Sequence, residues 1–214
     1  MLFEIERLTS PYSTATENLA LEESLLSGHR AAFFLHRDAP CVSVGLHQDL
    51  EAEVDVDLAE ARGVQIVRRQ TGGGAVYRDP GCVAASFVVP EAHDHLMVDV
   101  VVRALAVMGV AVERTGRNDL FLGDRKVSGF AWHKQAGMAI AHCSVLFSTD
   151  LELMTALLDR GKRKYRGTAI RSVRSRVRNL SDLFPEMDAA GFEEAFADAL
   201  VRSLEEHGIT VEGE

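Results

Sequence analysis

The chain has 214 residues, of which 47% are hydrophobic and 26% are charged, and its formal net charge is −9. This composition is that of a soluble globular protein with a substantial core. It contains no run of about 18 apolar residues, which excludes a membrane span, and no apolar leader that would predict a signal peptide. Three widely spaced cysteines argue for a reducing, cytoplasmic compartment and against a disulfide framework.

The first half of the chain predicts two helices and several short strands. Residues 15–27 have the apolar spacing of an amphipathic helix. A second helix is expected from about residue 55 to Gly63. Asp38-Ala39-Pro40 predicts a turn between the first two strands. Strands are expected at residues 31–37, 41–46, 64–70, 75–79 and 82–90.

The second half predicts a helix over residues 96–109 and then a run of strands joined by turns. Strands are expected at residues 110–116, 119–123, 126–134 and 138–148, and helices at 150–159 and 191–206. Hairpin-linked strands with separate helices indicate an α+β fold, with a mixed, largely antiparallel sheet flanked by helices. The pattern is not that of a doubly wound Rossmann fold.

Residues 160–178 form a basic stripe with nine Lys and Arg residues and no acidic residue. Proteins that bind nucleic acid are usually basic overall, which this chain is not. The stripe therefore favours a local phosphate site or a dock for an acidic protein partner, with a solvated loop as the alternative. His93 and His95 are read as an exposed loop, and no structural metal is expected.

Three consecutive glycines, Gly72, Gly73 and Gly74, lie between two predicted strands and are flanked by Arg68, Arg69 and Arg78. Glycines let the backbone approach a ligand closely, and guanidinium groups offer charge and forked donors. The loop lacks the P-loop pattern and does not open a helix as a dinucleotide fingerprint does. Nucleotide binding and a structural glycine turn both remain open from the spacing alone.

A second feature lies in residues 116–132, where Asn118 and Asp119 begin one strand and Lys126 begins the next. A hairpin would bring the Asp119 carboxylate and the Lys126 ammonium to one cavity. Lys126 could then neutralise a phosphate or polarise a carbonyl, and Asp119 could hold Mg²⁺ beside an ATP phosphate. The alternative is an ion pair on the surface of a hairpin.

Taken together, these stretches resemble the lipoate–protein ligase family. RRQTGGGAVYRD is similar to the family motif RRxxGGGxVxHD, and GRNDLFLGDRKVSGFAW is similar to RND followed by K[IV]SG[SAF]A. Three further segments resemble the family's first helix, its Gly-x-x-Gln turn and its SVRSRV segment: ENLALEESLL, PCVSVGLHQD and IRSVRSRVRNLSDL. The matches occur in the family's order and cover roughly residues 10 to 185.

The resemblance implies the fold shared by biotin ligases and class II aminoacyl-tRNA synthetase catalytic domains. It implies one catalytic domain over residues 1–214, without the C-terminal accessory domain typical of full ligases, which a separate protein could supply. The implied reaction joins lipoate and ATP, with Mg²⁺, into lipoyl-AMP. The lipoyl group then passes to a lysine of a lipoyl carrier domain, such as an E2 subunit or a glycine-cleavage H protein. No nucleic acid or membrane is implied.

The resemblance also assigns roles to residues. The three glycines would close over lipoate and adenylate, Val76 and Tyr77 would meet adenine through their main chain, and Arg69 would line the lipoyl–phosphate region. Asn118 and Asp119 would lie near the metal and phosphates, and Lys126 would contact the acyl carbonyl and phosphate. The remaining substrate-binding residues implied by the motifs are Ala75, Asp79, Ser128, Gly129 and His142.

The sequence departs from the family pattern at three positions. Arg78 replaces a histidine, Cys82 replaces an asparagine, and Cys143 replaces a glycine. Cys143 is read as a small apolar residue; as a nucleophile it would carry a thioester, as in related octanoyl- and lipoyl-transferases that need no ATP. The alternatives to a ligase are therefore such a transferase and a non-catalytic protein that binds lipoate or adenylate.

Overall fold

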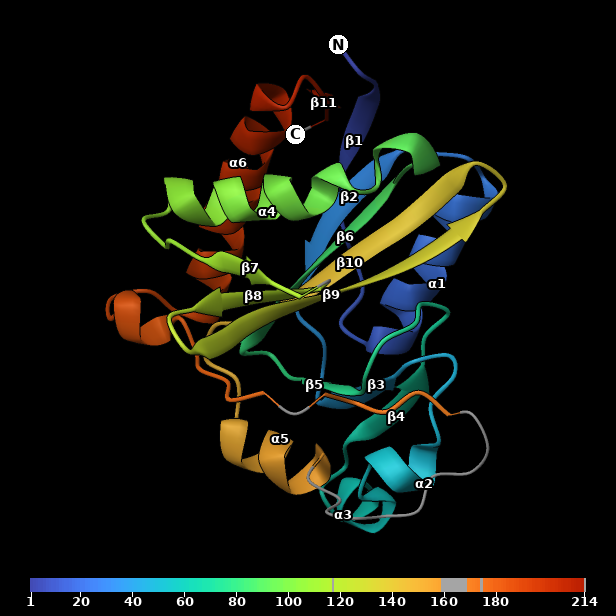
Figure 1. The fold of residues 1–214 in the computed structure, drawn as a ribbon, viewed down its shortest axis with the longest axis vertical. Helices are drawn as coiled ribbons and strands as arrows, with labels where there is room; N and C mark the ends of the chain where they lie inside the picture. Colours follow the sequence, from blue (N-terminus) through green and yellow to red (C-terminus); the bar gives the residue numbers. More distant parts are fainter. Residues whose placement is uncertain (117, 159–168, 174, 214) are drawn as a thin grey trace.

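The computed structural model describes residues 1–116, 118–158, 169–173 and 175–213. Its main element is an eight-stranded sheet with the order β11-β1-β2-β6-β10-β9-β8-β7 (Figure 1). Only β1 with β11 and β1 with β2 pair in parallel among these described strands; the other pairs are antiparallel. The strands are β1 (Glu4–Thr9), β2 (Ala32–His36), β6 (Cys82–Pro90), β7 (Glu113–Thr115), β8 (Asp119–Leu122), β9 (Arg125–Gln135), β10 (Met138–Leu146) and β11 (Thr210–Glu212).

Helices cover both faces of this sheet, so its central strand β6 is almost entirely buried. Helices α4 (Leu96–Val107) and α6 (Ala189–Glu206) pack on one face, where Phe33 of β2 belongs to the main core. Helix α1 (Ala15–Ser27) packs on the other face, where the next residue, Phe34, joins a second cluster. This alternation is the two-residue period of a strand buried on both sides.

A three-stranded sheet with the order β4-β3-β5 lies beneath the large one (Figure 1). Its strands are β3 (Cys41–Val44), β4 (Gln65–Arg68) and β5 (Val76–Arg78). Three short helices surround it: α2 (Leu50–Glu53), α3 (Val56–Ala61) and α5 (Leu151–Leu158). A separate apolar cluster around Tyr77, Val42 and Leu157 holds these parts together. The glycine loop connects the end of β4 to the start of β5. It faces the large sheet across the cavity between the two sheets.

The mixed, largely antiparallel α+β fold expected from the sequence is confirmed, as are the expected helices and the strands of the β8–β9–β10 meander. The two strands around Asp38 exist, but they do not pair with each other: β2 belongs to the large sheet and β3 to the small one. The sequence reading missed β1, β11 and α2, and two short 3₁₀ turns, Glu91–His93 and Ser181–Leu183. Among the described helices, none has the length and apolar character needed to cross a bilayer.

Candidate functional site

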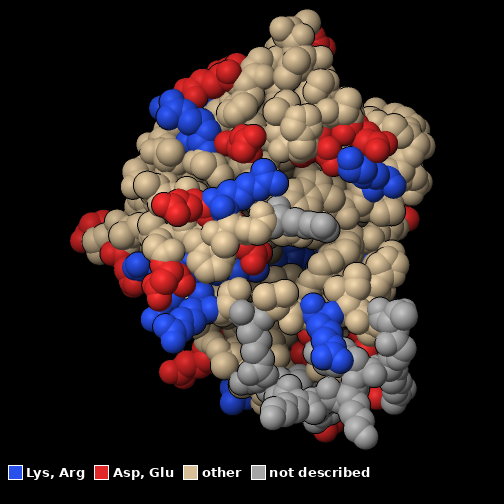
Figure 2. Space-filling model, viewed as in Figure 1, with Lys and Arg blue, Asp and Glu red and all other residues tan. Residues whose placement is uncertain are grey.

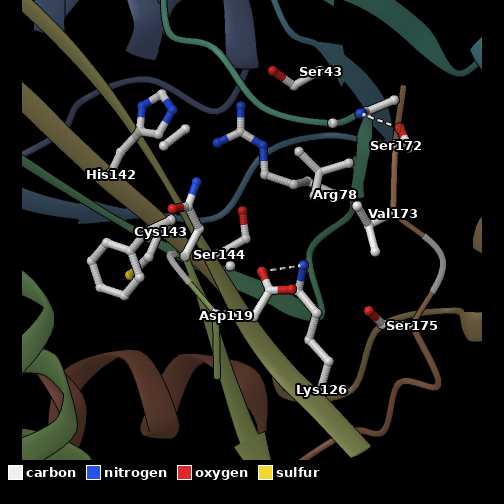
Figure 3. A pocket seen from close by; sticks show the side chains of 18 of the residues that line it. Ser43, Arg78, Asp119, Lys126, His142, Cys143, Ser144, Ser172, Val173 and Ser175 are labelled. Atoms are coloured by element: carbon white, nitrogen blue, oxygen red, sulfur yellow. Dashed lines mark hydrogen bonds and ion pairs between the residues drawn. The ribbon is translucent and has the colours of Figure 1, made fainter. Parts of the chain in front are cut away.

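A cavity of about 480 Å³ opens between the two sheets, in front of the glycine loop. Figure 3 shows Lys126 and Asp119 at one end and His142 and Ser43 at the other. Ser172, Val173 and Ser175 form one side wall. The floor comes from β9 and β10, and the predicted residues in its lining are Arg69, Gly74, Ala75, Val76, Asn118, Asp119, Lys126, Gly129 and His142.

A second hollow of about 290 Å³ adjoins the first and is more apolar at its far end. Val76, Lys126, Gly129 and Val173 line both hollows, so the two form one cleft. The far end is lined by Tyr77, Leu146, Met154, Leu158 and Val177, together with Ser128. The Ser128 hydroxyl is buried beside the Cys143 thiol. The cleft thus has a polar part and an apolar part, with the Lys126 side chain between them.

The hairpin of β8 and β9 brings Lys126 and Asp119 together, as the sequence predicted. Lys126 Nζ lies 2.8 Å from Asp119 Oδ1. The backbone beneath this pair is Gly129, where an added Cβ would lie 2.8 Å from the ammonium. A side chain at position 129 would therefore displace Lys126. The two groups retain about a quarter of their side-chain exposure, 22% for Lys126 and 26% for Asp119, so both can exchange their partner for a ligand.

Arg69 holds the glycine loop from behind. Its guanidinium donates to the carbonyl oxygens of Ser43 (2.7 Å), Gly72 (2.6 Å) and Gly74 (2.7 Å), and its Nε donates to Thr71 Oγ1 at 2.8 Å. Burial, and secondarily Arg78, lowers the pKa of Arg69 to about 10, which leaves it charged at neutral pH. Arg69 lines the cavity as expected, but most of its donors are committed to the loop.

The glycines of the loop differ in what they require. Gly73 has φ +87°, a left-handed conformation that favours glycine. At Gly74 an added Cβ would lie 2.9 Å from Ser172 Oγ. Gly72 does not line either hollow, and a Cβ there would meet nothing within 4 Å. Gly73 also lines neither hollow, so Gly74 is the one of the three glycines that borders the cavity.

Ser172 joins the loop to the neighbouring segments. Its hydroxyl accepts hydrogen bonds from the Ala75 N–H (2.9 Å) and from Gln48 Nε2 (3.0 Å). Its own N–H donates to Glu53 Oε1 at 3.0 Å. The sequence reading did not single out Ser172 or Gln48, although both lie in segments that resemble the family. Residues 160–168 of the predicted basic stripe, and Arg174, lie outside the described residues.

The Asp79 carboxylate accepts hydrogen bonds from the backbone and does not face the cavity. Its Oδ1 accepts from the Gly81 N–H (3.0 Å) and its Oδ2 accepts from the Asp150 N–H (2.8 Å), just ahead of α5. Asp79 is buried and lines neither hollow. Asp79 thus does not face the cavity, and its side chain lies beside that of Tyr77.

Arg78 lies in the cavity wall and is only 6% exposed. Its guanidinium pairs with Asp38 at 3.2 Å, and its Nε has no hydrogen-bond partner among the described residues. Asp38 in turn is held by His36 Nδ1 and Asn18 Nδ2, both at 2.9 Å. Although burial opposes the charge, Asp38 raises the pKa of Arg78, so a cation is fixed in this wall.

The cysteines are buried and reduced. Cys143 lines the larger hollow, and burial raises its pKa to about 12. Burial also raises the pKa of Cys82, which lies outside both hollows. A thiol with so high a pKa is protonated at neutral pH, whereas a nucleophilic cysteine needs a depressed pKa. The burial of Cys143 therefore favours its reading as a small apolar residue.

Comparisons with known proteins agree with this fold. A family model described as the lipoyl protein ligase A/B catalytic domain matches residues 14–201. A bi-partite lipoate protein ligase from Thermoplasma acidophilum, described with its E2 lipoyl domain, has a TM-score of 0.81 and 27% identity, covering all of this chain and 87% of that one.

Two further solved structures carry ligands. A T. acidophilum protein with bound lipoic acid has a TM-score of 0.79 and 26% identity, and covers all of this chain and 89% of its own. A lipoate-protein ligase A bound with ATP has a TM-score of 0.80 and 26% identity, with the same two coverages.

We expect Asp79→Ala to lower stability without weakening ATP binding. The substitution leaves two backbone N–H groups without their acceptor, a loss of about 1–2 kcal/mol in the free energy of unfolding. Chemical denaturation gives the stability, and calorimetry gives the ATP affinity. Unchanged stability with a weakened ATP affinity would show instead that Asp79 belongs to the binding site.

Gly129→Ala should impair the site while leaving the fold intact. The new methyl group would lie only 2.8 Å from the Lys126 ammonium, which is the end of a flexible side chain and can move away. Turnover should fall at least about tenfold, a loss of about 1.4 kcal/mol of transition-state stabilisation, with an unchanged melting temperature. Since both changes act on one ammonium, adding Lys126→Ala to Gly129→Ala should cost less than the two separate losses combined.

Proposed function

The chain belongs to the lipoyl protein ligase A/B catalytic domain family, and from its cleft we propose that it activates lipoate with ATP and transfers the lipoyl group to a lysine of a carrier domain. The observation that carries this proposal is the position of Lys126, whose side chain lines both parts of one cleft. An acyl-adenylate has its reactive centre between an acyl chain and a nucleoside, which matches a cation placed between two hollows.

We assign the acyl chain to the larger hollow and the adenosine to the smaller one. Val76 and Tyr77, assigned to adenine from the resemblance, line the smaller hollow, whose far wall is apolar. Ser128 belongs to the same lining, with its hydroxyl buried. The relatives with bound lipoic acid and bound ATP support the pair of substrates.

In the first half-reaction, a carboxylate oxygen of lipoate attacks the α-phosphorus of ATP and pyrophosphate leaves. Lys126 would release Asp119 and neutralise the charge that develops on the phosphate oxygens, an effect strengthened in a site from which water is excluded. Arg78 supplies a second fixed positive charge in the wall.

In the second half-reaction, the ε-amine of the carrier lysine attacks the acyl carbonyl, AMP leaves, and the amine loses its proton as the amide forms. Lys126 would polarise the carbonyl. The carrier is a lipoyl domain such as an E2 subunit or an H protein; the relative described with its E2 lipoyl domain supports this class of acceptor. That relative is also described as bi-partite, which supports the action of residues 1–214 as a catalytic unit together with a separate accessory protein.

We assign Mg²⁺ to the Asp119 carboxylate. Among the described residues, no three His, Cys, Asp or Glu side chains are grouped to hold a metal. This single carboxylate beside a phosphate site suits Mg²⁺, which takes its other ligands from phosphates and water. The metal would neutralise charge on the triphosphate. When Asp119 binds the metal, its ion pair with Lys126 would break, and the ammonium would be free to act on the substrate.

The decisive test is the intact mass of a lipoyl carrier domain after incubation with this protein, lipoate and Mg²⁺, with and without ATP. We expect a lipoyl-sized increase in mass only with ATP. An increase in mass without ATP, in a reaction given an octanoyl- or lipoyl-carrier protein as the donor, would identify a transferase. No increase in any reaction, even with an accessory protein added, would identify a binding protein.

Lys126→Ala should abolish lipoyl-AMP formation and leave the protein folded, because no other ammonium lines both hollows among the described residues. Adenylate formation is measured by release of pyrophosphate, and folding by circular dichroism. Turnover at the wild-type rate would remove Lys126 from the mechanism.

Cys143→Ser should keep ATP-dependent activity within about threefold, a change of about 0.7 kcal/mol or less in the barrier. The thiol is buried and protonated, so it is not required as a nucleophile. Loss of all activity, with a thioester adduct on the wild-type protein detected by mass spectrometry, would establish the transferase mechanism instead.

A further inference from the structure

Glu22 of α1 is a buried carboxylate that lines neither hollow of the cleft, and it is 3% exposed. A buried charge is costly unless it is paired and hydrogen-bonded. Burial alone would raise the pKa of Glu22, but His142 and Ser86 together lower it below its ordinary value. The carboxylate is therefore ionised at neutral pH and acts only as an acceptor.

This carboxylate determines where His142 carries a proton. His142 Nδ1 lies 2.9 Å from Glu22 Oε1 and 3.1 Å from Oε2, and the Ser86 hydroxyl donates to the same Oε1. Because an ionised carboxylate cannot donate, Nδ1 must carry the proton in both the neutral and the charged ring. The partner of one ring nitrogen thus sets the state of the other. In the neutral ring, Nε2 is left as an acceptor.

The other ring nitrogen of His142 connects it to the glycine loop. Its Nε2 lies 3.0 Å from Thr71 Oγ1, the same oxygen that accepts from Arg69 Nε. With the neutral ring, each link then has one donor and one acceptor: Arg69 donates to Thr71, Thr71 to His142, and His142 to Glu22. Arg69 in turn donates hydrogen bonds to the carbonyl oxygens of Gly72 and Gly74. A hydrogen-bonded chain therefore runs from α1 to the loop.

The same carboxylate is linked to the opposite wall of the cavity. Ser86 Oγ lies 3.4 Å from His36 Nε2, and His36 Nδ1 lies 2.9 Å from Asp38 Oδ1. Asp38 pairs with Arg78. Glu22 thus connects two buried chains of polar contacts. One chain ends at the carbonyls of the glycine loop, and the other ends at Arg78 in the cavity wall.

We propose that Glu22 is a positioning residue, which holds His142 with its proton on Nδ1 and thereby fixes Thr71, Arg69 and the glycine loop in the form that receives the acyl group. The identity of that acyl group rests on the proposed function. The position of the proton on His142 does not, because it is a property of the protein without substrate.

The test compares Glu22→Gln with the wild-type protein by ¹⁵N NMR of the histidine rings, with the His142 signals assigned from a His142→Gln variant. Glutamine has nearly the shape of glutamate, but its amide can donate to Nδ1. We expect the wild type to show Nδ1 protonated at neutral pH, and Glu22→Gln to show a mixture of Nδ1–H and Nε2–H rings. Amide exchange at residues 71–75 should become faster in the variant.

The adjacent Glu23→Gln is the matched control, because Glu23 has the same helix and charge but is exposed. It should leave the ring signals and the amide exchange unchanged. In turnover, Glu22→Gln should raise the KM for lipoate about tenfold, an effect of the size seen when the carboxylate partner of a metal-binding histidine is removed, and change kcat less than about threefold. Thr71→Val, which breaks the next link, should have an effect that is not additive with Glu22→Gln.

Unchanged His142 signals and loop exchange in Glu22→Gln would overturn the proposal, as would equal effects of Glu23→Gln. If the carrier domain is never lipoylated but the His142 signals change as expected, the proposed function fails while the placement of the proton by Glu22 stands. Additive effects of Glu22→Gln and Thr71→Val on the KM would show that the two residues act separately, and would also overturn it.

Discussion

The site depends on a single buried arginine. Three carbonyl oxygens from β3 and the glycine loop converge on the guanidinium of Arg69, and Thr71 takes a fourth donor. A loop of three glycines has little preferred conformation of its own, so these bonds supply the order that its sequence lacks. Planar guanidinium donors suit this task because they meet several acceptors in fixed directions. The shape of the cavity wall follows from this contact.

The reactive end of the cleft is built on a different principle. A tight hairpin turn at Gly123 (φ +62°) aligns β8 with β9, and this alignment brings Asp119 and Lys126 within 2.8 Å. Their exposure leaves the ion pair weak enough to be exchanged, as pairs in contact with water contribute little to stability. A firmly held loop thus faces a lysine whose partner can change, which suits binding at one wall and chemistry at the other.

The sequence predicted those parts of the fold and site that depend on local pattern. The amphipathic helix α1, the strands on either side of the glycines, and the β8–β9 hairpin with its Asp119–Lys126 pair all follow from spacing and turn residues. Strands β1 and β11 could not be found in this way, because they pair with each other across some two hundred residues. The direction in which a side chain points was equally hidden. Arg69 faces the loop carbonyls, Asp79 serves two backbone N–H groups, and Ser172 is brought to the loop by tertiary contacts alone.

The pairing of β1 with β11 has a consequence for the order in which the protein folds. Ile5 and Ile209 belong to the same core as Phe192 and Phe196 of α6, so the core cannot be completed until α6 and Ile209 have been synthesised. Contacts between distant parts of a chain also slow folding. Until then, the part of this face that α6 covers stays exposed, and exposed apolar surface of this kind is what chaperones bind during synthesis.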